Sequence, residues 1–159
     1  MADAKLTTVL WFDRDAEEAA RFYCETFPDS SLDSVQYAPS DFPSGKAGDA
    51  ITVQFTLMGR SFSGLNGGPM FTPNESVSFM VVTEDQAETD RYWDAVVGNG
   101  GTESACGWCK DKWGYSWQIT PRTLLDALQA GGEESKRAFD AMMTMTRIDV
   151  AAIDAARKG

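Results

Sequence analysis

At 159 residues, the chain is long enough for one domain with a sizeable buried core. Its 43% hydrophobic and 11% aromatic content exclude a disordered chain. A net charge of −10, from 24 acidic and 14 basic residues, disfavours nucleic-acid and anionic-membrane partners and indicates a cationic or neutral small molecule instead.

The chain contains no histidine, which is the most restrictive feature of its composition. Histidine is the usual general base near neutral pH and the commonest metal ligand, so its absence limits both kinds of chemistry. Three cysteines, an odd number, do not suggest a disulfide framework. The apolar run near the N-terminus is too short and too broken for a signal peptide or a membrane span, so we expect a cytoplasmic protein.

The first half of the chain reads as a strand, a helix and further strands. Residues 7–12 are apolar and rich in β-forming side chains, and Asp15, with Glu18 three residues later, is predicted to cap the next helix. Pro28 marks the end of that helix. A short strand near 34–37, a loop rich in Pro, Ser and Gly over 39–48, and two strands over 50–58 and 60–65 are predicted to follow.

The second half repeats this plan. A strand over 76–82 precedes a helix capped by Asp85, and a tight turn from Asp111 to Gly114 leads into a strand over 115–119. The helical pattern Asp-x-x-Glu-x-x-Arg from Asp15 recurs from Asp85. The strand pattern Gly-Arg-Ser-Phe-Ser from residue 59 recurs as Gly-Tyr-Ser-Trp-Gln from residue 114. The repeats predict an internally duplicated α+β domain.

After residue 120 the chain is predicted to be helical. One helix begins at Pro121, a second covers about 133–145, and Asp149 caps a last short one. The second helix carries an apolar stripe that we expect to pack on the sheet or on a second subunit, formed by Ala138, Met142 and Met145.

The strand over 115–119 supplies the first candidate for a site. By alternation Tyr115, Trp117 and Ile119 share one face, and Ser116 and Gln118 the other. A polar side chain aimed from a strand centre into a concave sheet can contact a ligand, which makes Gln118 the candidate.

Several segments carry a resemblance to a known family: Leu10-Trp-Phe-Asp, Ala16-Glu-Glu-Ala-Ala-Arg-Phe-Tyr, Glu84-Asp-Gln-Ala-Glu-Thr-Asp-Arg-Tyr-Trp, Cys106-Gly-Trp and Gly114-Tyr-Ser-Trp-Gln-Ile-Thr-Pro. They resemble the PhnB-like group, also labelled 3-demethylubiquinone methyltransferase-like, of the vicinal oxygen chelate (glyoxalase/bleomycin-resistance) superfamily. The resemblance implies paired βαβββ modules whose curved sheets enclose a cavity, usually in a homodimer. We therefore expect a single domain over 1–159, with modules at about 5–68 and 75–120 and a helical tail at about 121–157.

The methyltransferase label finds no support in the sequence. No strand is followed by a Gly-x-Gly-x-Gly turn that opens a helix, which a nucleotide-like methyl donor would typically require.

The resemblance also implies where a metal ion would sit. Superfamily members that carry out chemistry hold a divalent ion between His, Glu or Gln side chains from the first and last strand of each module. The last-strand positions fall on Gln118 and its repeat partner Ser63. The first-strand positions, whose register stays open, fall on Thr7 or Thr8 and on Ser76 or Ser78. Neutral amides and hydroxyls do not offset the dehydration of a divalent ion, so we expect no metal and no cofactor.

Two other features have competing interpretations. Cys106 and Cys109 have the spacing of a redox pair, but a turn and a strand follow them where a thioredoxin-type motif opens a helix, and a structural zinc would lack a fourth ligand. Packing is therefore the favoured interpretation, with redox or zinc binding as alternatives. Four indoles could form a cage for an apolar or cationic ligand or fill the core, namely Trp11, Trp108, Trp113 and Trp117.

The leading hypothesis is a homodimeric protein that binds a small molecule without a metal ion, in the cavity between the duplicated sheets. Its polar contacts are Gln118, Ser63, Thr7 and Ser76, and its walls are Trp11 and Trp117. One alternative is a metal-independent, or atypical metal-dependent, lyase or isomerase, which without histidine would use a carboxylate or a thiol as its base. Another is sequestration of a basic drug by charge and stacking.

Overall fold

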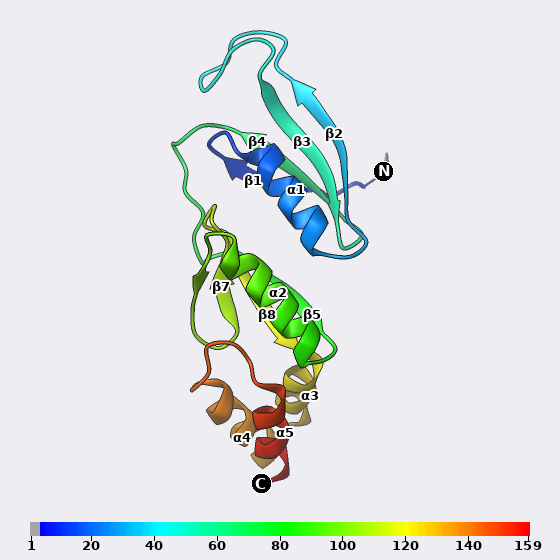
Figure 1. Ribbon diagram of the computed structural model, residues 1–159, viewed down its shortest axis with the longest axis vertical. Coiled ribbons are helices and arrows are strands. Elements are labelled where there is room, and N and C mark those ends of the chain that lie inside the picture. The colour runs from blue at the N-terminus through cyan, green and yellow to red at the C-terminus, as the bar shows by residue number, and fades with distance from the viewer. Residues whose placement is uncertain (1–3) are drawn as a thin grey trace. The chain divides into compact units, whose positions relative to one another are not determined.

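Strands and helices follow the predicted order over residues 4–159, which are the residues that this computed structural model describes (Figure 1). By its internal contacts the chain divides into two units, Met1–Pro73 and Asn74–Gly159, called unit 1 and unit 2 below. Within the described residues each unit has a sheet of four strands, and unit 2 ends in further helices. The predicted α+β fold, with tandem strand–helix–strand modules and C-terminal helices, is confirmed.

Unit 1 contains β1 (Thr8–Phe12), α1 (Ala16–Thr26), β2 (Ser31–Tyr37), β3 (Ala50–Leu57) and β4 (Arg60–Asn66). The strand order is β1-β4-β3-β2, in which β1 runs parallel to β4 and the other neighbours are antiparallel. The α1 helix packs on one face of this sheet. A Cβ added to Gly64 would lie 3.0 Å from the Cβ of Ala16, so glycine allows helix and sheet to approach closely at this point.

The start of α1 differs from the prediction. Asp15 makes no capping hydrogen bond through its side chain. Instead the backbone N–H of Ala16 donates to Oδ1 of Asn66 at 3.0 Å, and Nδ2 of Asn66 donates to the carbonyl of Ala50 at 3.0 Å. Asn66 therefore satisfies the helix N-terminus from the end of β4 and ties it to β3 as well.

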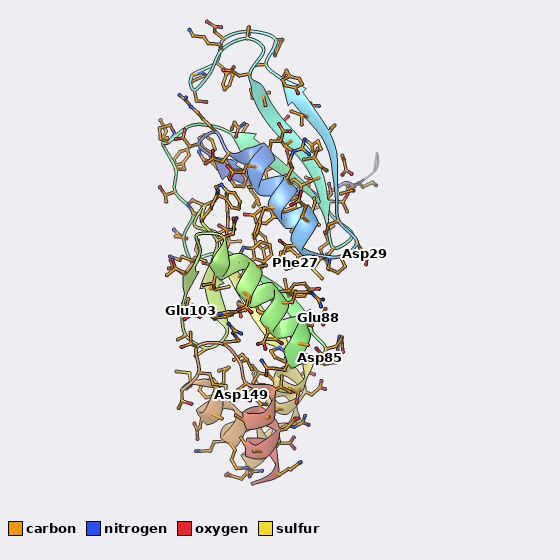
Figure 2. The ribbon with its side chains drawn as sticks, in the orientation of Figure 1. Phe27, Asp29, Asp85, Glu88, Glu103 and Asp149 are labelled. Atoms are coloured by element: carbon orange, nitrogen blue, oxygen red, sulfur yellow. The ribbon has the colours of Figure 1, made fainter. Side chains whose placement is uncertain are left out.

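Unit 2 contains β5 (Ser78–Thr83), α2 (Gln86–Gly98), β6 (Thr102–Glu103), β7 (Trp108–Lys110) and β8 (Ser116–Pro121), in the order β5-β8-β7-β6. As in unit 1, the first strand runs parallel to the last. The Asp85 cap is confirmed, because its carboxylate accepts the backbone N–H of Glu88 at 2.8 Å, and both residues lie at the same end of α2 (Figure 2). The strand begins at Ser78, so Ser76 lies in the preceding turn.

Asp111 is the centre of the turn between β7 and β8. It is 4% exposed. Its Oδ1 accepts the backbone N–H groups of Trp113 and Tyr115, each at 3.0 Å, and its Oδ2 accepts the indole N–H of Trp117 at 2.9 Å. Gly114, at φ 95°, closes the turn by donating to the carbonyl of Asp111. The carboxylate thus links turn, strand and buried indole.

The last three helices are α3 (Arg122–Ala130), α4 (Gly132–Met142) and α5 (Val150–Lys158), and Asp149 caps α5 as predicted. Ala138 of the predicted stripe is fully buried among these helices, and Met142 and Met145 pack against the same cluster. The stripe therefore packs within the helical segment rather than on the sheet. Among residues 4–159, no helix has the length and apolar character needed to cross a bilayer.

Ion pairs and hydrogen bonds connect α2 to residues 147–150, which lie between α4 and α5 and at the start of α5. Arg147 pairs with Asp90 at 3.0 Å and with Asp94 at 2.6 Å. Gln86 donates to the carbonyl of Ile148 and accepts the backbone N–H of Val150. Charged and neutral hydrogen bonds therefore join two helical layers of unit 2.

Replacing Asp111 by Ala should destabilise unit 2, because two backbone N–H groups and one indole N–H lose their buried acceptor. We expect the free energy of unfolding to fall by about 3 kcal/mol, measured by urea denaturation. The exposed carboxylate of Asp126 on α3 provides the matched control, since Asp126→Ala should change the free energy by less than about 0.5 kcal/mol. Similar values for the two variants would contradict the role given to Asp111.

Candidate functional site

The sheet of unit 1 has a helix-covered face and an opposite face that carries several of the predicted site residues. Leu10 and Phe12 of β1 are buried on the α1 side, so Val9 and Trp11 point to the other side, as does Thr7 immediately before the strand. We call this side the open face of unit 1. Along the parallel neighbour β4, the open face carries Ser61, Ser63 and Leu65.

The polar groups of this open face bond to one another across neighbouring strands. Oγ1 of Thr7 lies 3.1 Å from Oγ of Ser61. Nε2 of Gln54 donates to Oγ of Ser63 at 3.0 Å. A third pair joins the hydroxyl of Thr52 to Oε1 of Gln36 at 2.7 Å. These three pairs join neutral groups, and beside them on the same face Thr56 donates to the carboxylate of Asp33 at 2.8 Å.

The same arrangement recurs in unit 2. Nε2 of Gln118 donates to Oγ of Ser78 at 2.8 Å, on the side of the β5-β8 pair away from Trp117, which we call the open face of unit 2. In unit 1 Ser63 is opposite Val9, and in unit 2 Gln118 is opposite Met80. Thr7 lies two residues before Val9, and Ser78 lies two residues before Met80. Thr7 and Ser78 therefore occupy equivalent positions in the two units.

The other predicted contact residues lie elsewhere. Ser76 is exposed in the turn before β5, where its backbone N–H donates to Oδ1 of Asn74 at 2.9 Å. Trp117 is 1% exposed and its ring lies 5.3 Å from that of Phe79 on the α2 side of the sheet. Within unit 2, Gln118 and Trp117 therefore point to opposite faces.

Trp11 lines a mainly apolar pocket of about 340 Å³ at the end of the open face of unit 1. Its indole N–H donates to the carbonyl of Gly68 at 2.8 Å, and its ring meets Phe71 edge-on at a centroid distance of 4.9 Å. A Cβ at Gly67 would lie 2.3 Å from the ring, so only glycine lets the chain pass this close. We call this cavity the Trp11 pocket; its other walls include Phe42, Pro43, Ser44, Ile51, Leu65, Asn66 and Met70.

A second pocket, of about 570 Å³, shares Phe42, Pro43, Ser44 and Asn66 with the Trp11 pocket. We call it the charged lobe, because its remaining walls include four exposed charged side chains, Asp13, Arg14, Lys46 and Asp49. The shared wall residues mean that the two pockets adjoin each other.

The sequence did not indicate these pockets, because three of the four wall residues that they share come from the irregular loop over 39–48. Backbone bonds between Phe42 and Gly45 in both directions hold this loop, and Oγ of Ser44 donates to the carbonyl of Asn66 at 3.2 Å. Phe42 and Ser44 lack any periodic pattern that predicts burial. The one available signal was an aromatic residue inside a segment otherwise rich in Pro, Ser and Gly.

The donor set at the positions expected to hold a metal ion does not fit a divalent cation. Thr7, Ser63, Ser78 and Gln118 are neutral, and each is hydrogen-bonded to another neutral side chain. Within residues 4–159, no cluster of three or more His, Cys, Asp or Glu side chains is arranged to bind a metal. Hard divalent ions require several anionic oxygen ligands or imidazoles, which these positions do not supply.

The two cysteines of the Cys-x-x-Cys motif have different surroundings. Burial, with the nearby carboxylates of Asp111 and Glu103, raises the pKa of the Cys109 thiol to about 12. Cys106 is half-buried in the turn before β7, and its Sγ lies 3.7 Å from Sδ of Met143. A buried thiol with a raised pKa is a poor nucleophile, so Cys109 supports the packing interpretation of the motif.

The comparisons with known proteins agree with this fold. Residues 4–120 match the family model of 3-demethylubiquinone-9 3-methyltransferase, so α3, α4 and α5 lie beyond the match. A Bacillus cereus protein described as a 3-demethylubiquinone-9 3-methyltransferase, PhnB protein, is 32% identical, with a TM-score of 0.66 over 74% of this chain and 99% of that chain.

Two more distant structures share the fold alone. Protein PA1353 from Pseudomonas aeruginosa is 15% identical, with a TM-score of 0.60 over 75% of this chain and 98% of that chain. The fosfomycin resistance protein FosX from Mesorhizobium loti is 16% identical, with a TM-score of 0.56 over 81% of this chain and 99% of that chain. None of the curated proteins compared with the chain matches it.

Alkylation should distinguish the two thiols of the motif. At pH 8 a group with a pKa of about 12 is ionised in roughly one molecule in ten thousand, and its reactivity rises only as the pH approaches 12. We therefore expect iodoacetamide to modify Cys106 at least about a hundredfold faster than Cys109 in the folded protein, followed by peptide mass spectrometry. In urea both should react at similar rates. Equal rates in the folded protein would contradict the burial of Cys109.

Proposed function

Because the chain belongs to the 3-demethylubiquinone-9 3-methyltransferase family, a PhnB-like group of the vicinal oxygen chelate superfamily, we propose that it binds a small molecule without a metal ion. The observation that carries this proposal is the open face of unit 1, where hydroxyl and amide groups lead along β1 and β4 to the Trp11 pocket. An indole fixed by Gly67 and Gly68 presents a preformed apolar wall. Preformed pockets of this kind, with a few polar groups, are typical of small-molecule sites.

The predicted contact residues enter this proposal with distinct roles. Thr7 and Ser63 supply neutral hydrogen-bonding groups beside the Trp11 pocket in unit 1. Gln118 supplies the equivalent group in unit 2, where its bond to Ser78 supports Ser78 rather than Ser76 as the first-strand contact. Trp117 acts indirectly, because its burial against Asp111 fixes the strand that carries Gln118.

Binding is favoured over a metal-independent lyase or isomerase reaction. Such an enzyme would need a carboxylate or thiol base in a desolvated site. Asp13 and Asp49 beside the Trp11 pocket are exposed, and the raised pKa of Cys109 keeps that thiol protonated. None of these groups is the desolvated carboxylate or reactive thiol that such an enzyme would use as its base.

We further propose that the protein assembles as a homodimer. Val9 and Met80 occupy matched positions on the two open faces, and they are 60% and 50% exposed. Large apolar side chains repeated at matched positions favour a surface that a second copy covers.

Replacing Trp11 by Leu should weaken binding of an uncharged aromatic probe, 3-phenylpropanol, because the rigid wall of the pocket is lost. We expect the dissociation constant to rise roughly tenfold, as measured by ligand-observed NMR titration. The control is Phe22→Leu on α1, an aromatic residue of unit 1 outside both pockets. If wild type does not bind the probe, or if Trp11→Leu binds it equally well, the Trp11 pocket is not the site.

Light scattering during size-exclusion chromatography should give a mass near twice 17.4 kDa for the wild-type protein. The double variant Val9→Glu/Met80→Glu places charge on both apolar positions and should shift the mass to that of the monomer. Glutamates at the exposed positions of Arg21 and Arg91 on the helices serve as the control, and that variant should remain a dimer. A monomeric wild type would contradict the proposed dimer.

A further inference from the structure

The Trp11 pocket and the charged lobe adjoin each other, and we call the two together the amphipathic cavity. They share the wall residues Phe42, Pro43, Ser44 and Asn66, so a molecule seated against the indole lies close to the charged lobe. Asp13 and Arg14 follow Trp11 by two and three positions at the end of β1. With consecutive Cα atoms about 3.8 Å apart, the backbone of Asp13 lies within about 8 Å and that of Arg14 within about 11 Å of Trp11, which is the length scale of an amino acid.

The loop that forms the common wall is held in place by its own hydrogen bonds. The backbone N–H of Ala38 donates to the carbonyl of Asp49, and that of Gly48 donates to the carbonyl of Ala38, both at 2.8 Å. Ser44 joins the loop to Asn66, which also holds the first turn of α1. The cavity is thus preformed, which lowers the entropy that binding would cost.

Two of the four charges in the lobe already have partners. Nζ of Lys46 lies 3.2 Å from Asp41, whose pKa is lowered by a hydrogen bond from the backbone of Ala47 and by Lys46 itself. Oδ2 of Asp49 accepts the backbone N–H of Lys46 at 2.8 Å. These contacts shape the loop, in which Lys46 offsets the charge of Asp41 and, among the described residues, the carboxylate of Asp49 accepts only a backbone N–H.

The other two charges, Asp13 and Arg14, are exposed. Within residues 4–159 neither of them forms an ion pair. One carboxylate and one guanidinium without an ion-pair partner among the described residues therefore line the charged lobe, which adjoins the apolar Trp11 pocket. A ligand with a single charge would be attracted by one of them and repelled by the other, whereas a zwitterion can be attracted by both.

We propose that this cavity binds a small zwitterion with an apolar side group, such as an α-amino acid with an aromatic or aliphatic side chain. The side group packs against Trp11, the ammonium faces Asp13 and the carboxylate faces Arg14. The assignment rests on the proposed function, because it names the class of ligand for the same pocket.

Four probes that share a phenyl group test this assignment in the full-length protein. L-Phenylalanine carries both charges, 3-phenylpropionate only the carboxylate, 2-phenylethylamine only the ammonium, and 3-phenylpropanol neither. L-Phenylalanine should bind tightest in NMR titrations at low salt, with a gain of roughly two- to fivefold for each charge, the range of exposed ion pairs. The gain should shrink at 0.5 M salt.

Variants should separate the two contacts. Arg14→Gln should weaken the binding of L-phenylalanine and of 3-phenylpropionate by the same factor and leave the binding of 2-phenylethylamine unchanged. Asp13→Asn should weaken the binding of L-phenylalanine and of 2-phenylethylamine only. Arg21→Gln and Glu25→Gln, exposed charges on α1 away from both pockets, are the matched controls.

The outcomes distinguish this inference from the proposed function. Equal affinity for all four probes, or tighter binding of 2-phenylethylamine as expected for a basic drug, would overturn the zwitterion assignment while the binding function stands. Binding of 3-phenylpropanol alone would do the same. If none of the four binds, both the inference and the proposed function are wrong.

Discussion

Hydrogen bonds between neutral side chains on neighbouring strands determine what the two open faces are able to bind. The pairs Thr7–Ser61 and Gln118–Ser78 place hydroxyl and amide groups where a chelating protein needs anionic oxygens or imidazoles. Such groups are weak ligands for a dehydrated cation, but they suit a neutral or dipolar molecule with hydrogen-bonding groups of its own. The metal-free binding proposed for this chain depends on that pairing.

One buried polar side chain in each unit, Asn66 or Asp111, holds the strands that form the open face. In unit 1, Asn66 joins the ends of β3 and β4 to the first turn of α1, and it also lines both pockets. In unit 2, Asp111 holds the turn before β8 and fixes Trp117 on the helix side, which sends Gln118 to the opposite face. In each unit a buried polar side chain that bonds to at least two other groups thus holds the end of a strand in place.

The sequence predicted the duplicated architecture, and the equivalence of Ser63 and Gln118, because repeated turns and alternating strands are local signals. It predicted a side-chain cap at Asp15, which is wrong, because Asn66 lies about fifty residues away and only the folded chain brings it to the helix. The walls around Trp11 were likewise beyond prediction, since Phe42 and Ser44 acquire their places through non-local bonds in an irregular loop. Strand alternation alone predicts that Trp117 and Gln118 point to opposite faces. It does not predict the burial of the Trp117 indole, because the indole N–H bonds to Asp111, which only the folded turn brings close.

Anomalous diffraction from crystals soaked in manganese chloride tests the central claim most directly. The hydroxyl and amide oxygens of Thr7, Ser63, Ser78 and Gln118 should show no anomalous peak within coordination distance, and their side-chain hydrogen bonds should persist. A manganese ion bound by these side chains at about 2.2 Å would contradict the account, because the neutral groups would then coordinate an ion in place of their hydrogen bonds to one another.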